Sequence, residues 1–368
     1  MNKLNITKTT KNNFFTCGGF VVLAAIMLIL DSAGVLSNSV HGFLVPLCIY
    51  IIMAVSLNLV VGILGELSLG HAGFMCVGAY TSAIFTKCTE ATITSVPVRF
   101  TLALLVGAFC AALFGLLIGI PVLRLKGDYL AIVTLAFGEI IKNICNSIYL
   151  GLDSNGFHIS FKSAEALNLN ENGQVIIKGS LGISDMPLSS GNIMKENGYV
   201  IGAVLVLIIL IITLNLINSR PGRAIMAIRD NSIAAQSIGI DITKYKLMVF
   251  TLSAAFAGIA GTLFAHNYAS LSIGTDKFNY NASIMILVYV VLGGIGNIRG
   301  SIIATIILYV LPEELRFMRD YRMLMYAIVL IVVMLYNWSP KMQEYREVLR
   351  FRIRNKFAKK RSKEDIQV

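Results

Sequence analysis

The sequence predicts an all-α polytopic membrane protein with about ten transmembrane or partly re-entrant helices. Two observations of composition support this prediction: 56% of the 368 residues are hydrophobic and only 14% are charged. Soluble globular domains carry about 25% charged residues. The third observation is that apolar runs approaching the roughly 20 residues of a membrane-spanning helix recur along the chain. The mean hydropathy of +0.74 agrees with this class.

Ten apolar runs are candidate spans. They lie near residues 18–36, 43–63, 73–86, 100–120, 129–148, 198–217, 247–266, 283–297, 301–312 and 323–339. The pieces around 64–86 and 283–312 are candidates for re-entrant or broken helices, because their apolar runs are short for a bilayer. The count therefore carries an error of one or two spans.

Charged residues predict the orientation of these spans. Basic residues gather before the first run, in segment 218–246, and in the tail after Pro340, which alone holds ten. In segment 149–197, by contrast, five acidic residues outnumber three basic ones. Because cytoplasmic loops are enriched in Lys and Arg, both termini and segment 218–246 are predicted to be cytoplasmic, and segment 149–197 external. The net charge of +11 therefore indicates membrane topology rather than nucleic-acid binding.

The same pattern predicts the domain organisation. We expect a cytoplasmic arm at 1–17, one transmembrane domain at 18–340 and a basic cytoplasmic tail at 341–368. Within the transmembrane domain, 149–197 is an outer loop and 218–246 is a cytoplasmic loop, here called the central loop. The cysteines, none in CxxC spacing, are predicted to be small buried residues rather than a metal site. They stand at positions 17, 48, 76, 88, 110 and 145.

The central loop is unusual because polar and basic residues interrupt two strongly apolar runs. Pro221-Gly222 is expected to break the preceding helix. Asp230-Asn231-Ser232 supplies N-cap residues for a second short helix that ends at Gly239, and Asp241 or Thr243 can cap the next span. Helices this short are unstable alone, so the loop is predicted to need a tertiary or partner surface.

Two glycine-rich turns, Gly62–Gly73 and Gly293–Gly300, interrupt apolar runs and are weakly alike, which hints at an internal repeat. Non-helical backbone at membrane depth is tolerated only where protein or a watery cavity satisfies it, so the turns are candidates for lining a path. Close helix packing is the alternative role for glycines, and it is preferred for Gly258 and Gly261. His71 is expected to hydrogen-bond its turn rather than relay protons. The candidate path residues are Asn58, Gly65, Glu66, Ser68, His71, Gly294, Gly296 and Asn297.

Catalytic and nucleotide-binding motifs are missing from the sequence. The second glycine turn fails as a dinucleotide fingerprint because Arg299 stands where the third glycine belongs, and no βαβ pattern follows. No GxxxxGK[ST] motif occurs, so the chain is not expected to bind ATP in a P-loop. No Ser/His/Asp, paired-acid or HExxH constellation supports an enzyme. We therefore expect no cofactor on this chain.

Five long stretches carry a family resemblance. They are SLNLVVGILGELSLGHAGFMCVGAYTSAI (56–84), LRLKGDYLAIVTLAFGEII (123–141), GRAIMAIRDNSIAAQSIGIDITKYKLMVFTLSAAFAGIAGTLFAH (222–266), ILVYVVLGGIGNIRGSIIA (286–304) and LPEELRFMRDYRMLMYAIVLIVVMLY (311–336). Together they closely resemble the LivM-type subunit of the branched-chain amino-acid ABC transporter permeases. The resemblance covers nearly all of the membrane portion.

The resemblance implies a multi-pass importer subunit in the bacterial cytoplasmic (inner) membrane, with leucine, isoleucine or valine as substrate. The implied partners are a second, LivH-type permease subunit, two cytoplasmic P-loop ATPases that bind ATP with magnesium, and a periplasmic amino-acid-binding protein. It further implies that the central loop is a cytoplasmic coupling loop that contacts an ATPase and drives alternating access. The implied coupling residues are Arg223, Arg229, Asp230, Ala234, Ala235 and Gly239.

Two features depart from the family pattern. Gln236 stands where family members usually have an acid, so a salt bridge to the ATPase is not carried over to that position. A polar insertion around 157–181, with a hairpin expected around Glu171-Asn172-Gly173, lies on the side where a binding protein docks. Two alternatives stay open: a related permease for urea, short amides or other amino acids, and an ion-coupled secondary transporter, which the scarcity of central charges disfavours.

Overall fold

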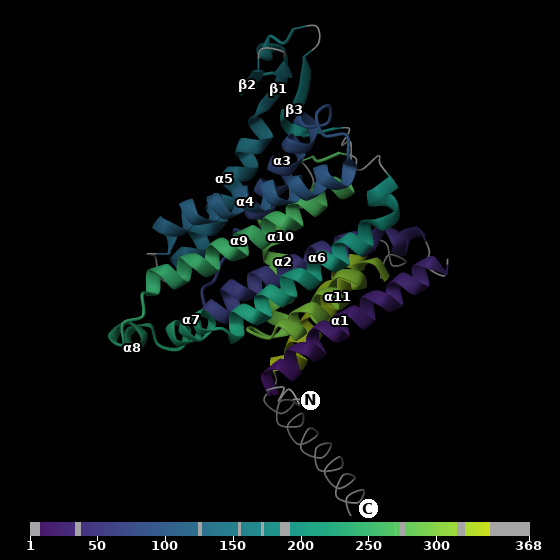
Figure 1. Cartoon of the computed structure of the whole chain (residues 1–368). Coiled ribbons are helices and arrows are strands. Elements are labelled where there is room, and N and C mark those ends of the chain that lie inside the picture. The colour runs from purple at the N-terminus through teal and green to yellow at the C-terminus, as the bar shows by residue number, and fades with distance from the viewer. Residues whose placement is uncertain are drawn as a thin grey trace, which may run out of the picture. The chain divides into compact units, whose positions relative to one another are not determined.

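The computed structural model describes residues 8–33, 38–123, 127–153, 156–170, 173–184, 192–268, 270–272, 277–314 and 321–338. The chain divides into two compact units, Met1–Ile306 and Ile307–Val368. The described residues of the first unit form helices α1 to α10, the start of α11 and a small sheet (Figure 1). Those of the second unit form the rest of α11 and helix α12.

The helices follow the apolar runs of the sequence closely. Their bounds are α1 Lys8–Ser32, α2 Asn38–Asn58, α3 His71–Cys88, α4 Val96–Val122, α5 Asp128–Ser147, α6 Asn192–Asn218, α7 Arg220–Asp230, α8 Ser232–Ser237, α9 Ile242–Asn267, α10 Tyr280–Gly293, α11 Ile298–Glu314 and α12 Arg322–Trp338. A π-helical turn, η1 (Leu59–Leu64), continues α2 without a break. Two single 3₁₀ turns, η2 (Glu165–Leu167) and η3 (Gly179–Leu181), lie near the sheet.

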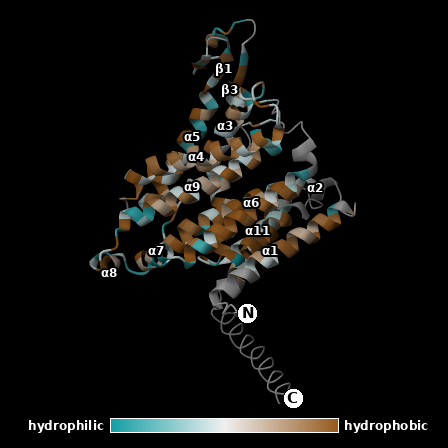
Figure 2. Cartoon of the chain, viewed as in Figure 1, coloured by the Kyte–Doolittle hydropathy of each residue, from teal (hydrophilic) through white to brown (hydrophobic). Residues whose placement is uncertain are grey.

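Five helices of the described part are long and apolar enough to cross a membrane. They cover Gly42–Leu64, Val96–Val122, Tyr129–Ser147, Asn197–Asn218 and Ile242–Asn267. Shorter apolar helices cover Thr16–Asp31, Tyr280–Gly293 and Ile298–Pro312. Figure 2 shows hydrophobic residues along most of α4 and α6. This is the predicted all-α polytopic architecture, whereas the count of ten spans and the re-entrant segments stay predictions.

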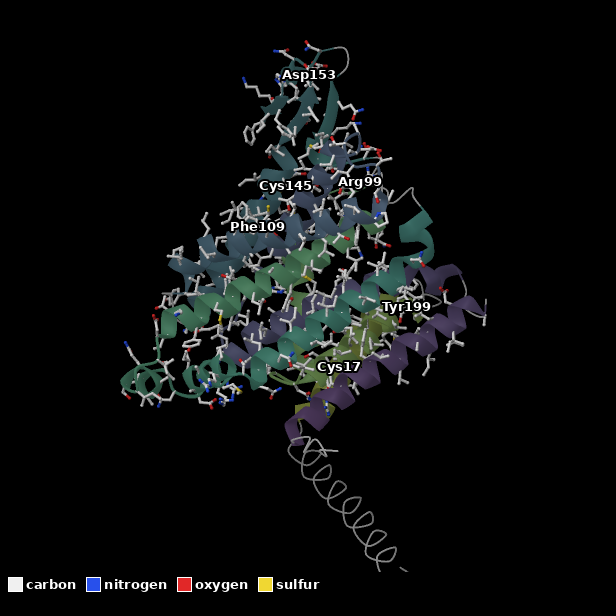
Figure 3. All side chains as sticks on the ribbon, in the orientation of Figure 1. Cys17, Arg99, Phe109, Cys145, Asp153 and Tyr199 are labelled. Atoms are coloured by element: carbon white, nitrogen blue, oxygen red, sulfur yellow. The ribbon has the colours of Figure 1, made fainter. Side chains whose placement is uncertain are left out.

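Helix α2 with η1 is the most enclosed of the long spans. Within its apolar stretch 94% of the residues are buried, against 33% for α4 and 28% for α5. The reason is that α2 packs against α6, α9 and α10. Helix α4 instead exposes apolar side chains such as Phe109, labelled in Figure 3, which is 69% exposed. Such a face suits lipid or another membrane subunit.

Helices α3, α4 and α9 approach one another closely through glycines. A Cβ added at Gly261 of α9 would lie 2.8 Å from the backbone nitrogen of Ala79, and one at Gly258 would lie 2.7 Å from the carbonyl oxygen of Gly107. Both distances are too short for a carbon atom in van der Waals contact. The predicted packing role of these two α9 glycines is therefore confirmed.

Both predicted glycine turns interrupt the helices. Residues 65–70 separate η1 from α3, and Gly294–Asn297 separates α10 from α11. Gly65, Gly294 and Gly296 have φ values of +83°, +97° and +79°, in the left-handed region that glycine adopts without strain. The helix breaks are thus set by glycine backbone geometry.

Segment 149–197 contains a three-stranded antiparallel sheet with strand order β2-β1-β3. Its strands are β1 (Tyr149–Asp153), β2 (Gly156–Ser160) and β3 (Gln174–Lys178). The sheet follows the end of α5, as Figure 1 shows, and Figure 3 labels Asp153 on β1. The Asp153 carboxylate accepts the backbone N–H of Asn170 at 3.1 Å, which fixes the loop that leads to β3.

A tight turn is present at the position of the hairpin expected around Glu171-Asn172-Gly173, because the Gly173 N–H donates to the Asn170 carbonyl at 2.8 Å. The expected pairing is wrong, because β3 pairs with β1 and not with the residues that precede the turn. Glu171 and Asn172 themselves lie outside the described residues. The physical reason is burial: Ile176 and Ile177 of β3 are 4% and 2% exposed in the sheet, whereas the preceding Asn-Leu-Asn segment offers too few apolar residues to pair.

Candidate functional site

The central loop folds as two short helices, α7 and α8. Helix α6 ends at Asn218, and the Ser219 side chain then caps α7 by accepting the N–H of Gly222 at 3.2 Å. Pro221 lies in the first turn of α7, where its missing N–H costs no helical hydrogen bond. A Cβ at Gly222 would lie 2.7 Å from the carbonyl carbon of Ile217, so the sharp corner needs glycine. The predicted break between α6 and α7 is confirmed.

The caps of α8 and α9 are those that the sequence predicts. Asn231 Oδ1 accepts the N–H groups of Ile233 and Ala234 at 3.1 and 3.0 Å. Gly239 has φ +86° and ends α8, with its N–H donated to the Gln236 carbonyl at 3.0 Å. Asp241, rather than Thr243, caps α9 by accepting the Lys244 N–H at 3.1 Å.

The two short helices present different surfaces. Ile225 and Ile228 of α7 and Ala235 of α8 are buried, at 0%, 3% and 2% exposure. Ile233 and Ile238, at either end of α8, are 80% and 75% exposed. Helix α7 packs on α6, η1 and α9, whereas α8 packs on α7 and α9. The loop is therefore anchored through α7, and α8 carries two exposed isoleucines.

Arg229 connects the central loop to the π-helical turn. Its Nη1 donates to the Gly62 carbonyl oxygen at 3.1 Å. Its Nε and Nη2 donate to Asp230 Oδ1 at 3.0 and 2.9 Å, so the carboxylate fixes the orientation of the guanidinium. The last carbonyls of a helix lack donors within the helix and carry partial negative charge, which a cation stabilises. Arg229 therefore caps the carboxyl end of η1.

Asn58 joins the two glycine turns. This side chain is fully buried, its Oδ1 accepts the Gly296 N–H at 2.9 Å, and its Nδ2 donates to Ser301 Oγ at 2.8 Å. A Cβ added at Gly62 would lie 2.6 Å from Gly296 Cα, so the two turns touch backbone to backbone. Two of the predicted path residues, Asn58 and Gly296, are thus in direct contact although 238 positions separate them.

The other path candidates are divided between several environments. Glu66 forms an ion pair with Lys246 of α9, and these side chains are only 15% and 14% exposed. His71 is buried and bonds through Nε2 to Ser56 Oγ of α2 at 2.6 Å, rather than to its own turn. Ser68 Oγ is buried without a hydrogen-bond partner among the described residues. Gly65 and Asn297 are exposed, and Gly294 is half-buried.

The remaining coupling candidates lie on the surface of the loop. Arg223 is exposed and its Nη1 donates to the Asn218 carbonyl at 3.2 Å, while Ala234 is exposed beside the buried Ala235. Lys246, Ser301 and Ser56 were not predicted as site residues. Lys246 appeared only as a topological charge, and nothing local distinguishes the two serines from ordinary residues of a helix.

Among the described residues, no group of three or more His, Cys, Asp or Glu side chains is placed to hold a metal ion. The six cysteines are free thiols, and Figure 3 labels Cys17 on α1 and Cys145 on α5. Cys48 and Cys76 are buried, as predicted for small core residues, while the other four are partly exposed.

Comparison with known proteins identifies the family. Residues 39–334 match the model of the branched-chain amino acid transport system / permease component family. LivM, the high-affinity branched-chain amino acid transport system permease protein, is 36% identical over 299 residues in both Salmonella typhimurium and Escherichia coli, covering 80% of this chain and 67% of the relative. LivH of Salmonella typhimurium is 25% identical over 264 residues, which cover 70% of this chain and 79% of LivH. No solved structure matches the chain significantly.

The matched region contains every element that builds the site, from α2 to α11. A permease component is a transport subunit and not an enzyme, in agreement with the sequence analysis. The chain belongs to the family of permease components of branched-chain amino acid transport systems.

Proposed function

We propose that the chain is the membrane-spanning permease subunit of an ATP-driven, binding-protein-dependent importer of leucine, isoleucine and valine. It moves substrate by alternating access in the bacterial cytoplasmic membrane, with both termini cytoplasmic. The partners are a LivH-type permease subunit, two P-loop ATPases that carry ATP and magnesium, and a periplasmic amino-acid-binding protein. Family membership and the 36% identity to LivM support the substrate class.

The central loop is the proposed ATPase contact. The observation that carries this assignment is that α8 has defined caps at both ends yet exposes Ile233 and Ile238. In a polar loop, two large apolar side chains held in solvent on an ordered segment suit burial by a partner protein, and the small side chain of Ala234 beside them permits close approach. Arg223, Arg229, Asp230, Ala235 and Gly239 then shape or border the contact.

The proposed translocation path passes the two glycine turns. Asn58, at the end of α2, contacts the second turn at Gly296. We assign to the same path the other candidates: Gly65, Glu66 and Ser68 of the first turn, His71 at the start of α3, and Gly294 and Asn297 of the second turn. The non-helical backbone at both turns and the orphan hydroxyl of Ser68 support this assignment, because polar groups of this kind need water or substrate as partners.

Transport by the reconstituted complex tests the proposal. Proteoliposomes that contain this chain, its partner permease and both ATPases are expected to take up leucine only when ATP and the binding protein are present. Uptake of urea or another amino acid in place of leucine would favour a related permease. Uptake that follows an ion gradient without ATP would refute the ATP-driven reading and favour a secondary transporter.

Gly239→Asp is expected to abolish ATP-driven uptake and leave membrane insertion intact. Nothing lies within 4 Å of a Cβ at this position, and Asp tolerates the left-handed backbone, so the chain can fold. The new carboxylate would be buried against the ATPase, and an unpaired charge at an interface costs on the order of 2–5 kcal/mol. Co-purification of the ATPase subunits with the variant measures the loss of ATPase binding.

The neutral variant Gly239→Asn has nearly the same shape and an equal tolerance of positive φ. It is expected to retain far more ATPase binding than Gly239→Asp. If the two variants bound the ATPase subunits equally well, Gly239 would not be part of the ATPase contact.

A further inference from the structure

We propose that Arg229 and Lys246 are positioning residues that transmit displacement of the central loop to the contact between Gly62 and Gly296. This inference rests on the proposed function, because it assumes that an ATPase moves the loop. It adds the route by which that movement reaches the glycine turns.

The residues that flank α8 in the sequence bind the same short stretch of chain, residues 62–66. Arg229, at the end of α7, donates to the Gly62 carbonyl, and Lys246, in the first turns of α9, forms an ion pair with Glu66. The two basic residues lie on either side of α8 in the sequence, and their partners are only four positions apart. A shift of α8 therefore acts on residues 62–66 from two sides.

Several contacts fix the conformation of the Arg229 side chain. Besides the hydrogen bond to Gly62, the aliphatic part of the side chain crosses Gly65, where an added Cβ would lie 2.6 Å from Arg229 Cγ. Asp230 holds the Nε–Nη2 edge of the guanidinium, which leaves Nη1 to reach the helix end. The planar guanidinium presents its donors in a fixed fork, whereas a lysine ammonium offers three donors from a single atom and does not fix this geometry.

The stretch that these residues hold is in direct contact with the second turn. Gly62 touches the backbone of Gly296, and the Gly296 N–H is already bonded to Asn58, one residue before η1 begins. The Gly62 carbonyl oxygen that Arg229 binds lies 3.3 Å from the position of a Cβ built at Gly296. Displacement of the end of η1 must therefore change the contact between the turns, because close-packed backbone has no free space in which to absorb it.

The alternative is that these contacts only stabilise the fold. The ratio of leucine transported to ATP hydrolysed distinguishes this structural role from the proposed transmission of movement. The complete complex is reconstituted with Arg229→Gln or Lys246→Met, and leucine uptake and ATP hydrolysis are measured in the same vesicles. We expect the leucine transported per ATP hydrolysed to fall about tenfold, which is within the usual range of coupling between sites. Lys244→Met removes an exposed lysine two positions from Lys246 and is expected to leave the ratio unchanged.

A charge exchange tests the ion pair in place. Glu66→Lys combined with Lys246→Glu is expected to recover a higher ratio than either single variant. An unchanged ratio in Arg229→Gln, or uptake and hydrolysis that fall in proportion, would overturn the proposal. If the Arg229→Gln complex does not assemble, Arg229→Lys is measured instead. We expect its ratio of leucine transported to ATP hydrolysed to be intermediate, and a ratio equal to that of the wild type would contradict the proposal. Failure of the wild-type complex to use ATP would refute the proposed function instead.

Discussion

Replacing Gly62 with valine is expected to reduce ATP-dependent leucine uptake to background and to lower the thermal stability of the purified complex. The new Cβ would overlap Asn58 Oδ1 and the Gly296 nitrogen, and would lie 2.6 Å from Gly296 Cα. Two of these three atoms belong to backbone, which cannot rotate away as a flexible side chain can. Overpacking a well-packed interior costs about 1–3 kcal/mol and occasionally more. Uptake assays and thermal unfolding followed in detergent measure the effect.

Gly19→Val is the matched control. Gly19 lies in a helix, is exposed, and has nothing within 4 Å of an added Cβ. The same chemical change there is expected to leave uptake and unfolding temperature close to those of the wild type. If Gly62→Val behaved like this control, the close approach of the two glycine turns would not exist in the working protein.

Asn58→Leu is expected to have the second largest effect. Leucine has the same branched skeleton of side-chain heavy atoms, but with methyl groups in place of the amide oxygen and nitrogen it can neither accept the Gly296 N–H nor donate to Ser301 Oγ. Leaving a buried polar group without its partner costs about 1–3 kcal/mol for each group. We therefore expect a lower unfolding temperature together with strongly reduced uptake, measured on the same preparations.

The second partner permits a double-mutant cycle. Ser301→Ala removes one of the groups that Asn58→Leu would orphan, so the double variant is expected to be less destabilised than the sum of the two single variants. Asn197→Leu, at an exposed position of α6, is the control for the substitution itself. Strict additivity in the cycle would show that Asn58 and Ser301 do not interact.

Local features of the site could be predicted from the sequence. Asn231, Gly239 and Asp241 were predicted as caps, and each makes the expected hydrogen bond within three residues of its own position. The predicted break between α6 and α7 and the two glycine turns are also present. These features are predictable because a cap or a positive φ depends on one residue and its immediate neighbours.

The partners of the site residues could not be predicted. His71 was expected to bond its own turn but bonds Ser56 of α2, and β3 pairs with β1 instead of forming the expected hairpin. In each case the hydrogen-bonding capacity of the residue was correctly identified. Which of several competent partners satisfies it depends on how the helices and strands pack.

The sequence by itself determined a polytopic helical membrane protein, its capped central loop, its two glycine turns and its family. Only the tertiary structure decided that Arg229 reaches Gly62 over 167 positions, that Lys246 meets Glu66 over 180, and that Asn58 bonds Ser301 over 243. The physical reason is that backbone geometry and capping act within a few residues. The pairing of distant polar groups instead follows from enclosed packing, where most buried donors and acceptors find a partner among whichever neighbours the fold supplies.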